Sequence, residues 1–178
     1  MAWSLSLCRS GHVRFEDPNG VKRSKTSAGL LMFRRIEEGV EVLLVHPGGP
    51  FFRNKDLGAW TVPKGEVAEG EDLRDRARLE FREELGTEPA TAQLIELGSV
   101  KQKGGKTVHA WAFEGDLPEN FVVTSNTFEL EWPPRSGGTR EFPEVDRAEF
   151  FSMDAARVKI NSAQVPFLER LINFLANK

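Results

Sequence analysis

The sequence contains no tyrosine, a single cysteine and no long apolar run. Cys8 carries the only thiol, so no internal disulfide can form and the fold does not need an oxidising compartment. No apolar stretch approaches the ~20 residues of a transmembrane helix. Residues 1–8 lack the basic segment and the continuous apolar run of a secretory signal. We therefore expect a cytoplasmic protein without a membrane partner.

An excess of charge of one sign is also missing. The 24 basic and 27 acidic residues give a formal net charge of −3, so the chain lacks the basic surplus of a dedicated nucleic-acid binder. A phosphate-bearing substrate remains compatible, because a metal ion can neutralise both partners. The 178 residues, 39% hydrophobic and 29% charged, suit one globular domain with a sizeable core.

The chain divides near residue 23. Residues 1–23 are polar and broken by turn residues such as Pro18, which favours a loosely ordered N-terminal extension. A strand at 13–15 that adds to a sheet edge is the alternative. Residues 24–178 would then form a single domain.

Strand and helix patterns alternate through this domain. We predict strands at 28–33, 40–45, 57–62, 94–101, 107–113, 127–132 and 148–151. We predict helices at 72–85 and 166–176, with a helical turn at 154–158. Residues 133–143, with two glycines and several prolines, are predicted to be a loop. The sum is a mixed α+β domain.

Three glutamates share one face of the helix predicted at 72–85. Glu80, Glu83 and Glu84 stand at i, i+3 and i+4, within one turn of each other. Like charges at this spacing repel, and hard divalent cations such as Mg²⁺ and Mn²⁺ prefer such oxygen ligands. The alternative is the solvated face of an amphipathic helix. The three positions alone do not decide between them.

The residues around these glutamates follow a long pattern of fixed spacing. It resembles the Nudix box, which runs glycine, five residues, glutamate, seven residues, arginine-glutamate-apolar, one residue, glutamate-glutamate, one residue, glycine-apolar. The matching positions are Gly65, Glu71, Glu80, Phe81, Glu83, Glu84 and Gly86. The preceding Pro63-Lys64-Gly65 turn is similar to that of the family. The resemblance implies an α/β/α Nudix sandwich, with a mixed sheet between helices and a catalytic loop–helix.

The resemblance also implies an activity and a set of roles. Nudix proteins are pyrophosphohydrolases that use a divalent metal, normally Mg²⁺ with Mn²⁺ possible. Glu83 and Glu84 would be the core metal ligands, and Glu80 a further ligand or the base near the attacking water. The region of Lys64 would offer a backbone carbonyl to the metal. Three residues would be structural: Gly65, Glu71 and Gly86.

Two positions depart from the box. Leu79 stands where the family has the arginine that orients the glutamates, and Thr87 replaces the last apolar residue. Arg76, four residues before Glu80, could supply a substitute charge. Leu79 also keeps a second function open, a catalytically weak domain that binds a nucleotide as a sensor.

A further carboxylate is expected in a late loop. In several dinucleoside-polyphosphate and RNA-end hydrolases of the family, a glutamate precedes a strand aromatic by six residues, as Glu144 precedes Phe150 here. We expect Glu144 to act as a general base or extra metal ligand, with Glu141 as second choice. The alternative for both is an exposed loop acid.

Cations and aromatic rings are the candidates for holding a nucleotide. We select Lys64, Lys101, Lys103, Phe52 and Trp111. Weaker candidates are Arg53, Lys55, Lys106, Phe51 and Trp132. The segment 125–140 exceeds a minimal Nudix domain and would shape substrate choice or form an interface.

The expected substrate is a nucleotide-type small molecule. Dinucleoside polyphosphates or nucleoside triphosphates come first, and ADP-ribose or nucleotide sugars are the nearest alternative. The sequence leaves the oligomeric state open.

Overall fold

The computed structural model describes residues 4–7, 13–16, 25–89 and 93–177. Within the N-terminal extension, strands β1 (Ser4–Leu7) and β2 (Val13–Glu16) pair antiparallel with each other. The alternative of a strand near 13–15 is therefore present, but its partner is β1 and not the edge of the main sheet. The remainder of the extension lies outside the described residues.

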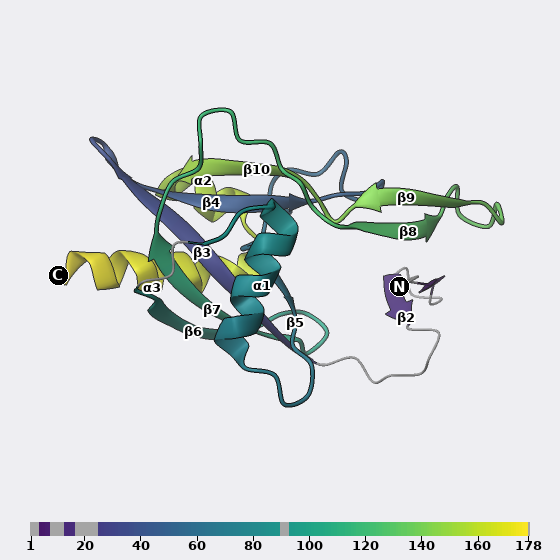
Figure 1. The fold of residues 1–178 in the computed structure, drawn as a ribbon, viewed down its shortest axis with the longest axis horizontal. Coiled ribbons are helices and arrows are strands. Elements are labelled where there is room, and N and C mark those ends of the chain that lie inside the picture. The colour runs from purple at the N-terminus through teal and green to yellow at the C-terminus, as the bar shows by residue number, and fades with distance from the viewer. Residues whose placement is uncertain (1–3, 8–12, 17–24, 90–92, 178) are drawn as a thin grey trace.

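A mixed sheet forms the centre of the domain (Figure 1). Its strands lie in the order β10-β4-β3-β7-β6, and β5 also pairs with β3. Their bounds are β3 Thr26–Ile36, β4 Gly39–Pro47, β5 Lys64–Glu66, β6 Ile95–Lys101, β7 Thr107–Glu114 and β10 Val145–Ser152. The β3–β7 pair is parallel and the others are antiparallel. This confirms the predicted mixed sheet, in which β3–β4 and β6–β7 form antiparallel hairpins.

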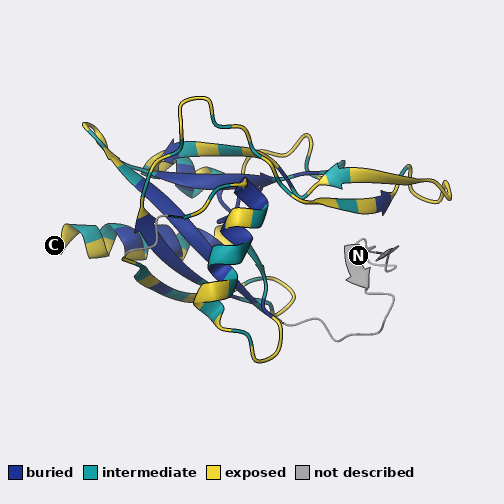
Figure 2. Cartoon of the chain, in the orientation of Figure 1, coloured by how far each residue is buried: buried dark blue, intermediate teal, exposed yellow. Residues whose placement is uncertain are grey.

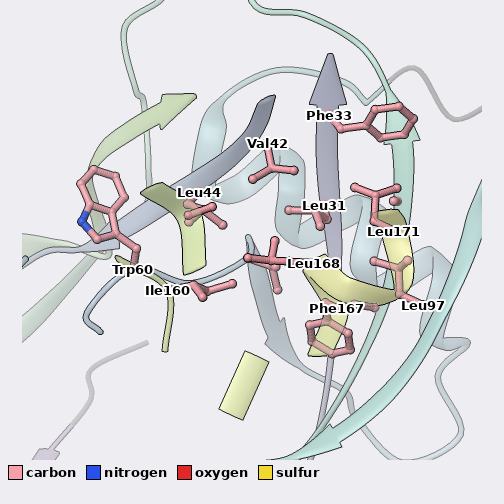
Figure 3. Packing of buried hydrophobic residues seen from close by; sticks show 14 of the residues in the cluster. Leu31, Phe33, Val42, Leu44, Trp60, Leu97, Ile160, Phe167, Leu168 and Leu171 are labelled. Carbon is pink, nitrogen blue, oxygen red and sulfur yellow. The ribbon is translucent and has the colours of Figure 1, made fainter. Parts of the chain in front are cut away.

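Helices cover both faces of the sheet. Helix α1 (Leu73–Leu85) packs on one face, while α2 (Met153–Lys159) and α3 (Val165–Ala176) lie on the other, joined by a short 3₁₀ turn, Ser162–Gln164. Because successive strand side chains point to opposite faces, Leu30 packs under α1 and Leu31 under α3. The buried apolar residues thus form two layers, one on each face of the sheet. Figure 2 shows that the central strands are largely buried, and Figure 3 shows the layer under α3.

Helix α1 begins and ends where the sequence predicts. The Asp72 side chain accepts hydrogen bonds from the backbone N–H groups of Arg74 and Asp75, which caps the first turn. At the other end Gly86 adopts a left-handed conformation, with φ of 72°. Three buried residues spaced by four, Ala77, Phe81 and Leu85, attach the helix to the sheet.

The strand predicted at 57–62 is wrong. Residues 57–59 are turn, and Trp60 and Thr61 make only isolated bridges, to Ile160 and Val45. Leu57 is 73% exposed, whereas Trp60 is fully buried. The apolar residues at this place serve to anchor a loop through Trp60, and the sheet strand that follows is the short β5.

The loop predicted at 133–143 is also wrong in part. Strands β8 (Thr127–Glu131) and β9 (Thr139–Pro143) pair antiparallel into a separate two-stranded hairpin, which projects from the body of the domain in Figure 1. The polar sequence of β9 does not predict a strand, because β9 is stabilised by pairing with β8 and not by full burial. No helix in the described part of the chain is long and apolar enough to cross a membrane.

Candidate metal and catalytic site

Glu80 lies directly over the backbone of Gly65. Its side chain projects from α1 toward β5, and Glu80 is only 6% exposed. A Cβ atom placed at Gly65 would lie 1.8 Å from the Glu80 carboxyl carbon. Only glycine therefore lets the helix bring this carboxylate against the β5 turn, which gives a steric reason for that position of the motif.

Arg76 holds Glu80 from one turn earlier on α1. Its guanidinium forms an ion pair with the Glu80 carboxylate, and its Nη1 lies 3.7 Å from Glu71 Oε1. The other oxygen of Glu71 accepts the backbone N–H of Ala68 at 2.9 Å. Arg76 thus links the loop before α1 to the carboxylate face and supplies the charge that the motif would place at Leu79.

Glu84 is a second buried carboxylate of the group, with 8% of its surface exposed. Its Oε2 accepts the backbone N–H of Lys64 at 3.2 Å. Burial raises the pKa of Glu84 to about 8, against the lowering effect of the neighbouring Lys64 ammonium. Burial likewise lowers the pKa of Lys64, although Glu84 favours its charged form.

Glu80 and Glu144 share the electrostatic environment of Glu84. Burial is the largest cause that raises the pKa of each, and the negative charge of Glu83 raises both further. Arg76 acts in the opposite direction on both groups. Glu144, in the bend immediately before β10, therefore lies near the carboxylates of α1, although the two segments are far apart in sequence.

Glu141 has a different environment. It is exposed on β9, and its carboxylate accepts a hydrogen bond from the Thr127 hydroxyl across the hairpin. Of the two late glutamates considered from the sequence, the geometry favours Glu144 as the one that joins the site.

The donor set suits a hard divalent cation. Within the described residues no three His, Cys, Asp or Glu side chains converge into a ready metal cage. Glu80 is paired with Arg76, and Glu84 accepts the Lys64 N–H. Both carboxylates are nevertheless buried near one another: burial is the main cause that raises their pKa values, and repulsion by neighbouring glutamates raises them further. A divalent cation would offset that repulsion.

The predicted substrate-binding lysines fall into two places. Lys64 lies within the carboxylate group, on β5. Lys101 and Lys103 are exposed on the β6–β7 hairpin, which Lys106 ties to β5 through a 2.9 Å ion pair with Glu66.

The two predicted aromatic contacts differ in access. Trp111 is 5% exposed and packs under α1, so the structure does not favour it as a stacking surface. Phe52 is half-buried in the loop after β4, with the Lys55 ammonium 5.0 Å from its ring centroid.

The sequence did not single out a polar pair at the start of β10. His46 is fully buried, with Nδ1 2.7 Å from Asp146 Oδ1 and Nε2 2.7 Å from the Lys55 carbonyl oxygen. These bonds fix the loop after β4 to β10. His46 and Asp146 are 100 positions apart in the sequence, so no local pattern could predict the pair.

Comparisons with known proteins agree with this geometry. A family model described as NUDIX domain matches residues 23–171. The structure of a Caenorhabditis elegans Ap4A hydrolase binary complex superposes with a TM-score of 0.62 and 21% identity, over 85% of this chain and 99% of that one. No curated protein sequence matches the chain.

Two further structures extend the comparison. The NUDIX domain of Shewanella oneidensis NrtR, complexed with ADP ribose, gives a TM-score of 0.59 and 15% identity over 90% of this chain and 94% of that one. The MutT protein of Methanosarcina mazei gives 0.53 and 20% over 87% and 97%. At these identities the likeness shows the shared fold.

Proposed function

The chain belongs to the Nudix family, and from this we propose that it hydrolyses a phosphoanhydride bond in a nucleoside polyphosphate with the help of a divalent metal. The observation that supports the proposal is a group of four neighbouring glutamates, in which Glu80 and Glu84 are buried and Glu83 and Glu144 are half-buried. A retired enzyme would have no need to keep four mutually repelling carboxylates beside one another.

The carboxylates and the metal would divide the chemistry. Glu83 and Glu84 would hold Mg²⁺ or Mn²⁺, with the region of Lys64 contributing a backbone oxygen. When bound, the metal neutralises phosphate charge and makes water a better nucleophile. Glu80, fixed by Arg76, would complete the ligand set or serve as a second base.

Glu144 is suited to the proton transfer. Its burial raises its pKa, which brings a carboxylate closer to the range in which it accepts a proton at neutral pH. Water would attack phosphorus, its proton would pass to Glu144, and a nucleotide or phosphate would leave. The Lys64 ammonium beside Glu84 is placed to meet the phosphate chain.

Dinucleoside polyphosphates and nucleoside triphosphates are the preferred substrates in this proposal. Two features support a long phosphate chain. Glu144 precedes Phe150 by six residues, and Lys101 and Lys103 are exposed cations on the β6–β7 hairpin, which Lys106 joins to β5 through Glu66.

A release assay with excess Mg²⁺ tests the proposal directly. The substrates are diadenosine polyphosphates, nucleoside triphosphates, ADP-ribose and nucleotide sugars. We expect turnover of the first or second class and complete loss on chelation. Absence of turnover from a folded protein that binds Mg²⁺ would contradict the proposal and leave nucleotide sensing as the function.

Glu83→Gln provides the matching variant. Glu83 is partly exposed on α1, so the amide should fold normally while it removes one negative charge from the centre of the group. We expect kcat to fall at least about 100-fold, as for the loss of a metal ligand. The control is Glu69→Gln, in the exposed loop before α1, which should keep the wild-type rate.

A further inference from the structure

A second concave site lies between the loop after β4 and the β8–β9 hairpin. The cleft has a volume of about 540 Å³, within the range of small-molecule sites. It is bounded by segments that lie far apart in the sequence. Its polar and aromatic lining consists of Arg53, Asn54, Trp132, Arg140, Phe142 and Asp146.

Specific contacts hold the two walls of the cleft together. The Gly48 N–H donates to the Glu144 carbonyl at 2.9 Å, and a Cβ at Gly48 would lie 2.1 Å from the Pro143 carbonyl oxygen. Phe51 packs edge-on against Trp132, with ring centroids 5.7 Å apart. The loop and the hairpin are therefore fitted to one another, and the cleft is a formed feature of the fold.

The charge of the cleft is positive. Arg53 and Arg140 are exposed and make no ion pair or side-chain hydrogen bond within the part of the chain that the structure describes. The Asp146 carboxylate is already engaged, by His46 Nδ1 at 2.7 Å and by Arg147 Nε at 3.6 Å. Two free guanidinium groups thus face one space, and their planar fork suits phosphate.

Trp132 adds an aromatic surface beside these cations. The ring is half-buried, with Phe51 against it on the loop side and Phe142 in the same cleft. A nucleobase stacks on such a face with little regard to its identity. Guanidinium groups that bind phosphate, next to an indole ring that stacks on a base, are suited to recognise a nucleoside phosphate.

The cleft adjoins the carboxylate group but has its own lining. Val145 packs in the apolar layer under α1, whereas Asp146, which lines the cleft, bonds His46, whose ring contacts Trp60 in the opposite layer. Glu144 lies between Pro143 and Val145 in the chain, so it marks the side on which the two sites are neighbours. None of the carboxylates proposed for catalysis lines the cleft.

We propose that this cleft is a nucleoside monophosphate site, with the phosphate on Arg53 and Arg140 and the base on Trp132. It does not require the catalytic metal, because its own cations meet the phosphate. Occupancy of the cleft is therefore independent of the hydrolysis proposed above.

Calorimetric titration of the full chain with AMP in the presence of EDTA tests the site. We expect one AMP to bind, and Arg53→Gln and Arg140→Gln each to weaken binding about tenfold or more, the loss expected for a charge-assisted contact. Arg35→Gln is the matched control, since Arg35 is an exposed arginine paired with Glu114 outside the cleft. It should bind AMP as the wild type does.

Two further comparisons test whether the base contributes to binding and whether AMP binds at the cleft or at the carboxylate group. Trp132→Leu should remove the preference for AMP over inorganic phosphate, and Trp132→Phe, which keeps an aromatic face, should retain it and covers the case that Leu does not fold. Glu83→Gln should bind AMP at wild-type affinity. The proposal is overturned if AMP does not bind, if both arginine variants bind it unchanged, if phosphate binds as well as AMP, or if Glu83→Gln abolishes binding.

Discussion

The position and charge environment of the Glu80 carboxylate depend on two neighbouring residues, Gly65 and Arg76. Gly65 makes room for it, and Arg76 neutralises it. The glycine belongs to the fixed spacing of the motif and could be predicted as part of it. The arginine could be proposed only from its i, i+4 relation to Glu80, because Leu79 occupies the expected place. The geometry shows that the missing charge has been restored from three positions earlier.

Removal of Arg76 should therefore damage the site more than an exposed charge would. In Arg76→Gln the buried Glu80 carboxylate loses its ion pair, and the link to Glu71 is lost with it. We expect kcat to fall about ten- to hundredfold, as for a displaced catalytic group, and stability to fall by about 1–3 kcal/mol. Steady-state kinetics and thermal unfolding measure both, with Arg82→Gln, an exposed arginine on the same helix, as control.

The companion change is Leu79→Arg. In the wild type it should leave the rate almost unchanged, because Arg76 already pairs with Glu80. In the Arg76→Gln background it should recover much of the lost rate, since it restores the charge where the motif has it. A marked gain in the wild-type background would show that Arg76 does not replace the motif arginine.

Some residues of the molecule could not have been foreseen. Arg53 and Trp132 were weak candidates among many cations and rings, and Arg140 and Asp146 were not candidates at all. Each is unremarkable in its local sequence. They become a group only because the hairpin folds onto the loop after β4, and that docking depends on contacts between distant segments.

Among the elements, hydrophobic periodicity predicted those in which buried and exposed residues alternate regularly. Helix α1 carries an apolar residue every fourth position and has both caps, and it was predicted almost to its ends. β9 failed because only Phe142 of its five residues is even partly buried. The segment 57–62 failed for the opposite reason, since a buried Trp60 resembles a strand residue yet anchors a loop.

The β8–β9 hairpin should be removable without loss of the domain. It pairs only with itself, and just one of its residues, Leu130, is buried below 5% exposure. Replacement of residues 127–143 by a short Gly-Ser linker should preserve cooperative thermal unfolding and Mg²⁺-dependent turnover, while AMP binding in EDTA disappears. A truncated chain that fails to fold would show that the hairpin is part of the core, contrary to its separate pairing.

At the scale of the whole molecule, the two apolar layers carry the stability and the acidic group works against it. Both layers are filled by sheet and helix residues that exclude water. The carboxylates of α1 and Glu144 lie at the border of one layer, where each loses hydration and repels the others. The fold therefore holds a local strain that a cation relieves, which couples metal binding to global stability.

This coupling has a defined dependence on pH. The pKa of Glu84 is about 8 in the folded protein against an ordinary value of 4.5, and the pKa values of Glu80 and Glu144 are raised as well. Between pH 4.5 and about 8 these carboxylates therefore bind more protons in the folded state than in the unfolded state, so their contribution to stability without metal falls as the pH rises through that window.

Mg²⁺ should reverse this trend, because it binds the deprotonated carboxylates and competes with protons for them. Thermal unfolding in EDTA should give a lower Tm at the alkaline end of that window than at the acidic end, and Mg²⁺ should raise Tm most at the alkaline end. Glu84→Gln, which can still accept the Lys64 N–H, should flatten the pH dependence in EDTA and reduce the response to Mg²⁺. A Mg²⁺ response of equal size at both ends would mean that the buried carboxylates are not the metal ligands.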